Sequence, residues 1–219
     1  MKKAVVFDMD GVLIDSQPLH YEIDMNVLKK CGYQANLETV TPYTGMSNPD
    51  RWPIYKSSLN LDQKVETLIS MQEQIMMETF KNVPLSAIEG IPSLLDQLNK
   101  KGLKCAVASS SSHELINLVL ERTGIRKYFD ALISGEDVTN GKPHPDIYLH
   151  AAKVLDVTPK DCVAIEDSPN GLKSAKSAGF FVIAYRNPTT YGQEFTHADH
   201  IVDDYDSCGS FISKMSVSV

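Results

Sequence analysis

Five short, nearly continuous apolar runs, rich in β-branched residues, most restrict the folds open to this chain. Runs of this kind are typical of strands buried on both faces of a parallel sheet. Helical patterns separate most of them, and this alternation predicts an α/β fold with a doubly wound, Rossmann-like parallel sheet. The expected strands are residues 4–7, 103–109, 131–134, 162–166 and 180–185, and the expected helices among the later ones are 93–101, 113–123, 146–155 and 170–178.

Residues 16–85 interrupt this rhythm and contain no convincing strand. Apolar residues four apart predict a helix that begins at Ser16 and Pro18 and ends at Gly32, and a longer helix is expected over 62–81. A block of about 70 residues is marginally stable alone and should pack on a larger domain. We therefore expect a core of residues 1–15 and 86–219, with an all-helical cap, 16–85, inserted after the first strand.

Composition narrows the classes of function. The 219 residues have a formal net charge of −7, which disfavours a nucleic-acid partner. Four widely spaced cysteines, without zinc-like spacing, indicate free thiols in a reducing compartment. The first residues resemble neither a signal peptide nor a membrane anchor. The sequence predicts a cytoplasmic protein with no membrane association and with no obligate protein partner evident.

Polar side chains follow the expected core strands, at the points where those strands end. Asp8 and Asp10 follow the first, Ser109 ends the second, and Glu166 and Asp167 end the fourth. Lys142 stands in the segment after the third. Because ligands of open parallel sheets bind beyond the carboxyl ends of the strands, we expect these side chains to share one crevice.

Such a crevice suits phosphoryl transfer. A carboxylate such as Asp8 attacks phosphorus to give an aspartyl-phosphate. A divalent metal between Asp8, Asp167 and a phosphate oxygen, with Lys142 opposite, removes the repulsion between two anions. Asp10 points to the same side of the chain as Asp8 if the extended geometry persists. There it protonates the leaving oxygen and then accepts a proton from water, which is typically worth ~10²–10⁴ in rate.

Simpler explanations exist for single pieces of this pattern. A calcium loop beginning at Asp8 fails at three positions that it requires. Asp167 is also suited to cap the helix expected at 170–178, the serines after Ser109 to form a turn, and Lys142 to be a solvated loop residue. The ordered combination is what favours an active site.

Four segments, FDMDGVLIDS, AVASS, GKPHPDIY and IEDSPNG, resemble the signature motifs of the haloacid dehalogenase superfamily, and the resemblance covers essentially the whole chain. It is most similar to the branch with a helical cap, which includes sugar-phosphate phosphatases and beta-phosphoglucomutase. The resemblance implies that Asp8 is the nucleophile and Asp10 the general acid and base. It also implies that the Ser109 side chain, the Ser110 backbone and Lys142 bind phosphate. Glu166 and Asp167, with Asp8 and Asp10, would serve Mg²⁺.

The expected cap has its own points of resemblance. His20 stands where beta-phosphoglucomutase has a histidine, and Gly45 and Ser47 match its cap loop in the segment YTGMSNPDR. Where the mutase-like pattern has a lysine and an arginine, this chain has Thr44 and Asn48, and Arg51 lies three residues further on. These six residues are the candidate substrate contacts of the cap.

The loss of two cations that would bind a second phosphate favours hydrolysis over isomerisation. The sequence thus predicts a magnesium-dependent phosphatase of small phosphorylated metabolites, with sugar phosphates as the expected class. A beta-phosphoglucomutase-like isomerase is the main alternative. A non-catalytic phospho-receiver is a third, disfavoured because it needs neither Asp10 nor an inserted helical block.

Overall fold

The computed structural model describes residues 2–44 and 46–216, which form two compact units. Unit 1 contains 2–15, 85–188 and 193–216, and unit 2 contains 16–84 and 189–192. The sequence placed the second boundary one residue later and assigned 189–192 to the core rather than to the cap.

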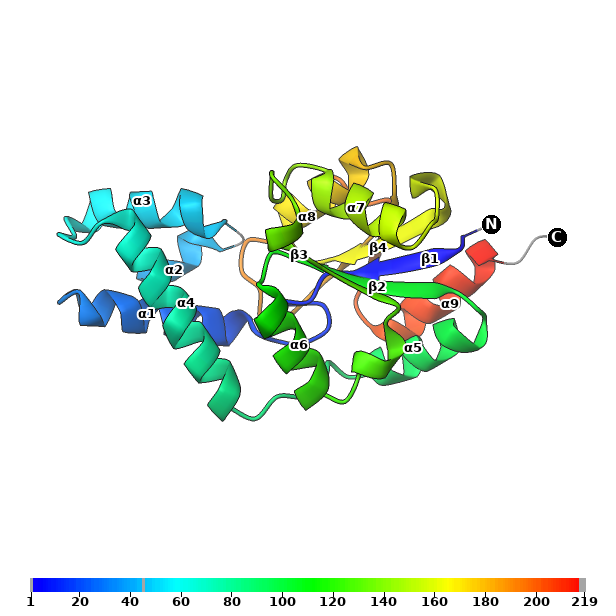
Figure 1. Cartoon of the computed structure of the whole chain (residues 1–219), viewed down its shortest axis with the longest axis horizontal. Helices are drawn as coiled ribbons and strands as arrows, with labels where there is room; N and C mark the ends of the chain where they lie inside the picture. The colour runs from blue at the N-terminus through cyan, green and yellow to red at the C-terminus, as the bar shows by residue number, and fades with distance from the viewer. Residues whose placement is uncertain (1, 45, 217–219) are drawn as a thin grey trace. The chain divides into compact units, whose positions relative to one another are not determined.

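Unit 1 is built on a six-stranded sheet in the order β3-β2-β1-β4-β5-β6, and every neighbouring pair is parallel (Figure 1). The order reverses beside β1, because β2 and β3 lie on one side of it and β4 to β6 on the other. The predicted doubly wound sheet is confirmed. Its strands are β1 (Ala4–Phe7), β2 (Lys104–Ser109), β3 (Ala131–Ser134), β4 (Cys162–Glu166), β5 (Phe181–Tyr185) and β6 (His200–Val202).

Helices cover both faces of this sheet. Figure 1 shows α7 and α8 on one face and α5 and α9 on the other. The first face packs an apolar cluster in which small residues such as Ala106 and Ala164 of the strands meet Ala151 and Ala175 of the helices. The helices are α5 (Ile91–Lys100), α6 (His113–Arg122), α7 (Asp146–Val154), α8 (Pro169–Ser177) and α9 (Tyr205–Ser216). Short 3₁₀ turns occur at Arg126–Tyr128, Gly135–Asp137 and Pro159–Asp161.

Local capping explains where two of these helices begin. The Ser112 side chain accepts a hydrogen bond from Leu115 N at the start of α6, and Ser168 accepts one from Gly171 N at the start of α8. Each bond satisfies an amide that has no partner within the helix. The start of α8 matters for the site, because the end of β4 lies directly before it.

All regular elements among the described residues of unit 2 are helices. Unit 2 comprises α1 (Gln17–Lys30), α2 (Leu37–Val40), a 3₁₀ turn (Thr41–Tyr43), α3 (Asn48–Leu59) and α4 (Val65–Asn82). Its interior contains Trp52 and Tyr55 of α3 and Leu68 of α4, all fully buried. The helix that the sequence predicted at 62–81 begins at Val65, after the turn that follows α3.

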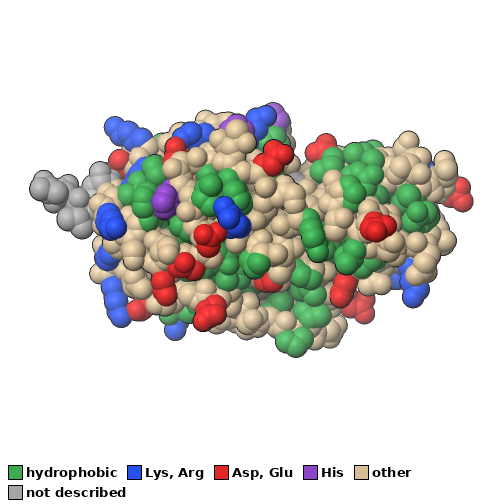
Figure 2. Space-filling model, turned by 180° about the vertical axis from the view of Figure 1, so that it is seen from behind, with side chains coloured by type: hydrophobic (Ala, Val, Ile, Leu, Met, Phe, Trp, Pro, Cys, Tyr) green, Lys and Arg blue, Asp and Glu red, His purple; other side chains and the backbone are tan. Residues whose placement is uncertain are grey.

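No helix formed by the described residues is both long and apolar enough to cross a membrane. Acidic and basic side chains are interspersed with apolar ones on the face shown in Figure 2.

Candidate active site

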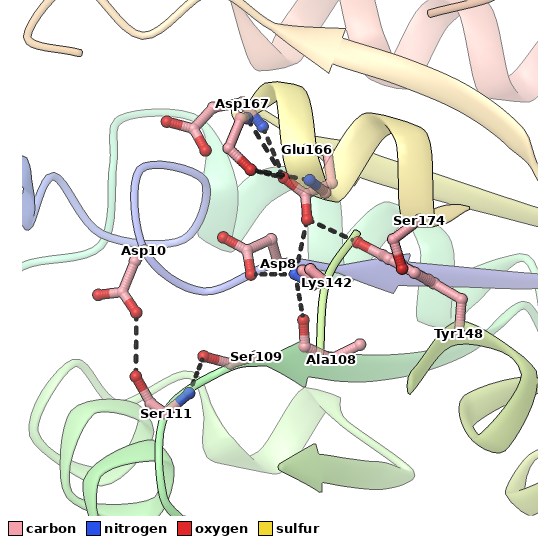
Figure 3. A network of polar contacts seen from close by, with 12 residues as sticks. Asp8, Asp10, Ala108, Ser109, Ser111, Lys142, Tyr148, Glu166, Asp167 and Ser174 are labelled. Atoms are coloured by element: carbon pink, nitrogen blue, oxygen red, sulfur yellow. Dashed lines mark hydrogen bonds and ion pairs between the residues drawn. The ribbon is translucent and has the colours of Figure 1, made fainter. Parts of the chain in front are cut away.

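The candidate site lies beyond the carboxyl ends of β1, β2 and β4, where the strand order reverses. Asp8 follows β1, Ser109 ends β2, and Glu166 ends β4 (Figure 3). Asp8 is 8% exposed, whereas Ser109 and Glu166 are fully buried. Three central strands therefore bring the predicted residues to one edge of the sheet, where ligands of such folds bind.

Lys142 reaches this edge from the loop between β3 and α7. Its Nζ donates to Asp8 Oδ1 at 2.7 Å, to Glu166 Oε1 at 2.6 Å and to the Ala108 carbonyl at 3.0 Å. Its side chain is 7% exposed. A buried ammonium needs such partners, and three acceptors use the three donors that a lysine has. Lys142 is thus held beside the Asp8 carboxylate.

Glu166 has five hydrogen-bond donors on its carboxylate. Oε1 accepts bonds from Lys142 Nζ and from the Tyr148 hydroxyl, the latter at 2.8 Å. Oε2 accepts bonds from Asp167 N, Ser168 N and Ser168 Oγ at 3.1, 3.3 and 3.1 Å. A carboxylate with two oxygens offers about four lone-pair sites, so Glu166 is fully occupied. Its orientation is set from three directions.

Tyr148 is a member of the site that the sequence did not reveal. It is fully buried in α7, six positions after Lys142, and Lys142 Nζ lies 5.2 Å from the centre of its ring. Burial raises the pKa of Tyr148, and the nearby Glu166 carboxylate raises it further, so the hydroxyl keeps its proton. An aromatic residue on a helix is usually a core residue, and only the contact with Glu166 sets this one apart.

Two glycines let backbone approach these carboxylates. Gly11 has φ +78°, and a Cβ there would lie 2.1 Å from Asp167 Oδ2. At Gly171, in the first turn of α8, a Cβ would lie 1.9 Å from Glu166 Oε1. Neither approach leaves room for a side chain, so both positions require glycine.

Asp8 and Lys142 shift each other's protonation. Burial raises the pKa of Asp8 to about 7; Lys142 opposes this shift, while Glu166 and Asp10 add to it. Burial alone would lower the pKa of Lys142, but the carboxylates of Asp8 and Glu166 outweigh it and raise the value. The lysine therefore remains charged at neutral pH, and further positive charge at this site would favour the ionised form of Asp8.

The acidic residues suit a divalent cation. Oxygen atoms of Asp8, Glu166 and Asp167 lie within 4.8 Å of one another, and all three residues are buried. Carboxylate oxygens are the ligands that hard cations such as Mg²⁺ prefer. A cation would also offset the repulsion among three buried carboxylates, two of which contact Lys142. The donor set thus fits the predicted metal, and Asp10 stands outside this group of three.

Asp10 is linked to the β2 end of the site through serines. Ser111 Oγ donates to Asp10 Oδ2 at 3.2 Å, and Ser111 N donates to Ser109 Oγ at 3.1 Å. Ser110 lies between them with an exposed side chain, and its carbonyl is so close to Gly135 that a Cβ there would lie 2.9 Å away. The sequence predicted roles for Ser109 and Ser110 but not for Ser111, which the structure shows in contact with Asp10.

The cap residues predicted to contact substrate occupy unit 2. Thr44 Oγ1 donates to the Thr41 carbonyl at 2.7 Å, and Ser47 Oγ donates to Asp50 Oδ2 at 2.6 Å. The His20 ring lies 5.9 Å from that of Phe80. Asn48 and Arg51 are hydrogen-bonded to each other, and Gly45 lies outside the described residues. Their roles toward a substrate stay predictions.

Together, the doubly wound parallel sheet and the aspartate-centred site place the chain among α/β proteins whose site lies beyond the carboxyl ends of the strands. The family model for haloacid dehalogenase-like hydrolases matches residues 5–185, and the chain belongs to that family. The resemblance seen in its four motifs is confirmed.

Individual relatives perform more than one reaction. The chain is 33% identical over 177 residues to a phosphorylated carbohydrates phosphatase of Thermotoga maritima, covering 81% of this chain and 82% of that one. It is also 33% identical over 215 residues to the beta-phosphoglucomutase of Bacillus subtilis, covering 91% and 88%. Among solved structures, a variant of CbbY from Rhodobacter sphaeroides, in complex with xylulose 1,5-bisphosphate, matches with a TM-score of 0.80 at 26% identity, covering 94% and 95%.

Proposed function

We propose that the chain is a magnesium-dependent phosphatase that hydrolyses small phosphorylated metabolites, with sugar phosphates as the substrate class, through an aspartyl-phosphate on Asp8. The observation that carries the proposal is the contact between the buried Asp8 carboxylate and Lys142 at 2.7 Å, beside a cluster of acidic residues. The similarity to a carbohydrate-phosphate phosphatase supports the substrate class. The cytoplasmic location expected from the sequence stays a prediction.

In the proposed reaction, an oxygen of Asp8 forms a bond to phosphorus as the bond from phosphorus to the substrate's ester oxygen breaks. Asp10 gives its proton to that leaving oxygen. A water molecule then attacks the phosphorus of phospho-Asp8 while Asp10 accepts a proton from the water; the bond from phosphorus to the Asp8 oxygen breaks, which releases inorganic phosphate and restores Asp8. The Lys142 ammonium offsets negative charge that gathers around the phosphoryl oxygens, and the serine segment 109–111 supplies hydroxyl and amide donors to them.

Magnesium at this site would supply positive charge that lets two anions approach. Of the four carboxylates that the sequence assigns to the metal, we propose Asp8 and Asp167 as direct ligands and Asp10 and Glu166 as supporting groups. Glu166 fits the supporting part because five hydrogen bonds already occupy its oxygens.

The test is release of inorganic phosphate from a panel of phosphorylated sugars and polyols, by the whole chain with Mg²⁺. Acid quenching during turnover, followed by peptide mass analysis, should find one phosphoryl group on the peptide that contains Asp8. The Asp8→Asn variant should lose both signals, whereas Lys173→Ala, a change of an exposed residue on α8, should keep them. Multiple turnovers by Asp8→Asn would rule out the nucleophile assignment.

The main alternative, an isomerase that moves phosphate within a sugar, is favoured by the similarity to beta-phosphoglucomutase. Both reactions pass through phospho-Asp8, so the site in unit 1 supports either one. A mutase must also hold a substrate with two phosphate groups, and we propose that the cap residues of unit 2 decide this point.

A further inference from the structure

Unit 2 contains a buried polar cluster of its own, which we call the Asp24–Arg51 cluster. It consists of Asp24 from α1, Asn48, Arg51 and Tyr55 from α3, and Gln72 from α4. Asp24 is 2% exposed, Gln72 2% and Arg51 9%. Charged residues are rarely buried to this extent without a specific partner.

Arg51 faces a carboxylate on one side of its guanidinium. Its Nε lies 3.3 Å from Asp24 Oδ2, and the geometry is that of an ion pair rather than of an aligned hydrogen bond. The Tyr55 hydroxyl donates to the same oxygen at 3.3 Å. Burial raises the pKa of Asp24, whereas Arg51, His20 and Tyr55 all favour its ionised form. An arginine remains protonated in proteins, so the pair brings opposite charges together.

The other side of the guanidinium is also occupied. Arg51 Nη2 donates to Asn48 Oδ1 at 2.7 Å, and Asn48 Nδ2 donates in turn to Gln72 Oε1 at 3.0 Å. Contacts with Asp24 of α1 and Asn48 of α3 thus hold Arg51 in one orientation, and Gln72 of α4 holds Asn48. Moving Arg51 toward a ligand would break these bonds and leave the buried Asp24 carboxylate without its partner, which is costly in a medium of low polarity.

The rest of this region offers little positive charge. From Tyr33 to Leu59 the sequence has two basic residues, Arg51 and Lys56. Lys56 Nζ donates to the carbonyls of Leu61 and Gln63 at 2.7 and 2.8 Å, which ties it to the end of α3. Thus Arg51 is paired with a carboxylate, and Lys56 is hydrogen-bonded to backbone carbonyls.

We infer that Asp24 cancels the charge of Arg51, so that the cap selects monophosphates of neutral sugars or polyols and discriminates against sugar bisphosphates. This inference rests on the proposed function, in which the cap residues of unit 2 decide between hydrolysis and isomerisation. A phosphate dianion gains little from a cation whose charge a buried carboxylate already balances. Arg51 therefore does not replace the lysine and arginine of the mutase-like pattern, whose places are taken here by the neutral Thr44 and Asn48.

The experiment compares kcat/KM for fructose 6-phosphate and fructose 1,6-bisphosphate, or for another monophosphate and bisphosphate pair if the panel favours one. The wild-type chain should prefer the monophosphate. Asp24→Asn keeps the size of the side chain but leaves Arg51 uncompensated, so it should raise kcat/KM for the bisphosphate about 10-fold relative to the monophosphate. Tyr55→Phe is the matched control, because it removes a bond to the same carboxylate oxygen without changing any charge, and it should leave the ratio unaltered.

The double variant Asp24→Asn/Arg51→Met removes both charges and should restore the wild-type preference. Arg51→Met alone gives a second reading if Asp24→Asn does not fold, with circular dichroism as the check on folding. It should leave the preference for the monophosphate intact or strengthen it. If the wild-type chain uses bisphosphates as well as monophosphates and Arg51→Met loses that ability, the inference is wrong.

An unchanged ratio in a folded Asp24→Asn variant would also overturn it. Failure of the wild-type chain to release phosphate from any compound is a different result, and it would refute the proposed function instead.

Discussion

Asp8 combines two demands that conflict at the scale of a single side chain. A nucleophile at phosphorus must be ionised, yet Asp8 is buried beside Glu166, and this environment raises its pKa. Lys142, 2.7 Å from Asp8 Oδ1, partly offsets this rise in pKa, and the proposed metal would offset the rest. The same conflict should be measurable as a loss of stability.

We expect Asp8→Asn to stabilise the metal-free protein at higher pH. Because the pKa of Asp8 rises from 3.8 to about 7 on folding, the folded state binds a proton that the unfolded state has released between those values. Stability therefore falls as pH rises through this range, and asparagine has no such dependence. Melting temperatures with chelator should show the variant gaining on the wild type from about pH 4 to about pH 7. A difference independent of pH would contradict the raised pKa.

Tyr148→Phe tests the hydroxyl that bonds to Glu166. Its loss removes one donor from Oε1, so Lys142 becomes the only remaining donor among those described for that atom. A hydrogen bond to a charged group contributes about 1.5–3 kcal/mol, and we expect a loss of stability in this range. We also expect a fall in kcat greater than any rise in KM, because Lys142 is drawn toward Glu166.

Phe180→Leu is the control for Tyr148→Phe, because the Phe180 ring packs on that of Tyr148 and does not bond to Glu166. It should alter stability but not the balance between kcat and KM. Equal kinetic effects from both variants would assign Tyr148 to packing alone.

At the scale of elements, the junction between β4 and α8 organises the acidic end of the site. Glu166 is the last residue of β4, and the amides of Asp167 and Ser168 at the start of α8 donate to its carboxylate. Both amides lie between the strand and Pro169, the first residue of α8, and they donate to the carboxylate rather than to the helix. The strand end and the helix start therefore fix Glu166 together.

Gly171→Ala should disrupt this junction. The added methyl would lie 1.9 Å from Glu166 Oε1, and the five donors on Glu166 leave that carboxylate little freedom to move. Overpacking of this kind typically costs about 1–3 kcal/mol, and activity should fall more steeply because Lys142 moves with Glu166. Lys173→Ala, an exposed change two positions further along α8, is the control for both urea unfolding and activity. A Gly171→Ala variant with wild-type turnover would show that the carboxylate is not held as described.

At the scale of the whole molecule, a chain with net charge −7 is proposed to act on anionic substrates. Positive charge must therefore be supplied locally, by Lys142 and by the metal. Chelation should abolish turnover, and Mg²⁺ should restore it, whereas Ca²⁺, which is larger and less strict in its geometry, should restore it poorly. Mg²⁺ should also raise the melting temperature of the wild type, and by less in Asp167→Ala. Full turnover after exhaustive chelation would exclude the metal.

Whether the chain hydrolyses or isomerises its substrate depends on the site of unit 1 and on the cap residues of unit 2 together. We expect beta-glucose 1-phosphate, supplied with a trace of glucose 1,6-bisphosphate, to yield free phosphate with little glucose 6-phosphate. The reason is that Thr44 and Asn48 are neutral and Arg51 is paired with Asp24, so a bisphosphate is held weakly. Both products can be followed in one enzymatic assay. Glucose 6-phosphate accumulating faster than phosphate would make the chain a mutase.

The sequence alone was sufficient for five of the six strands and for most of the residues around Asp8. Apolar runs at 4–7, 103–109 and 162–166 form strands because a fully buried strand leaves a continuous pattern. Parallel strands place their carboxyl ends at the same edge of the sheet. Residues that directly follow these strands therefore lie near one another, however the rest of the chain packs. Asp8, Ser109 and Glu166 were predictable for that reason.

Only the tertiary structure decided which other side chains meet. In the sequence Tyr148 looks like an ordinary core residue. Its hydroxyl reaches Glu166 because of the position at which α7 packs on the sheet. Asp24 and Arg51 are separated along the chain and lie on different helices, so no periodicity relates them. Sequence patterns report which face of an element is buried, whereas a contact between two buried polar atoms depends on how three or more elements pack together.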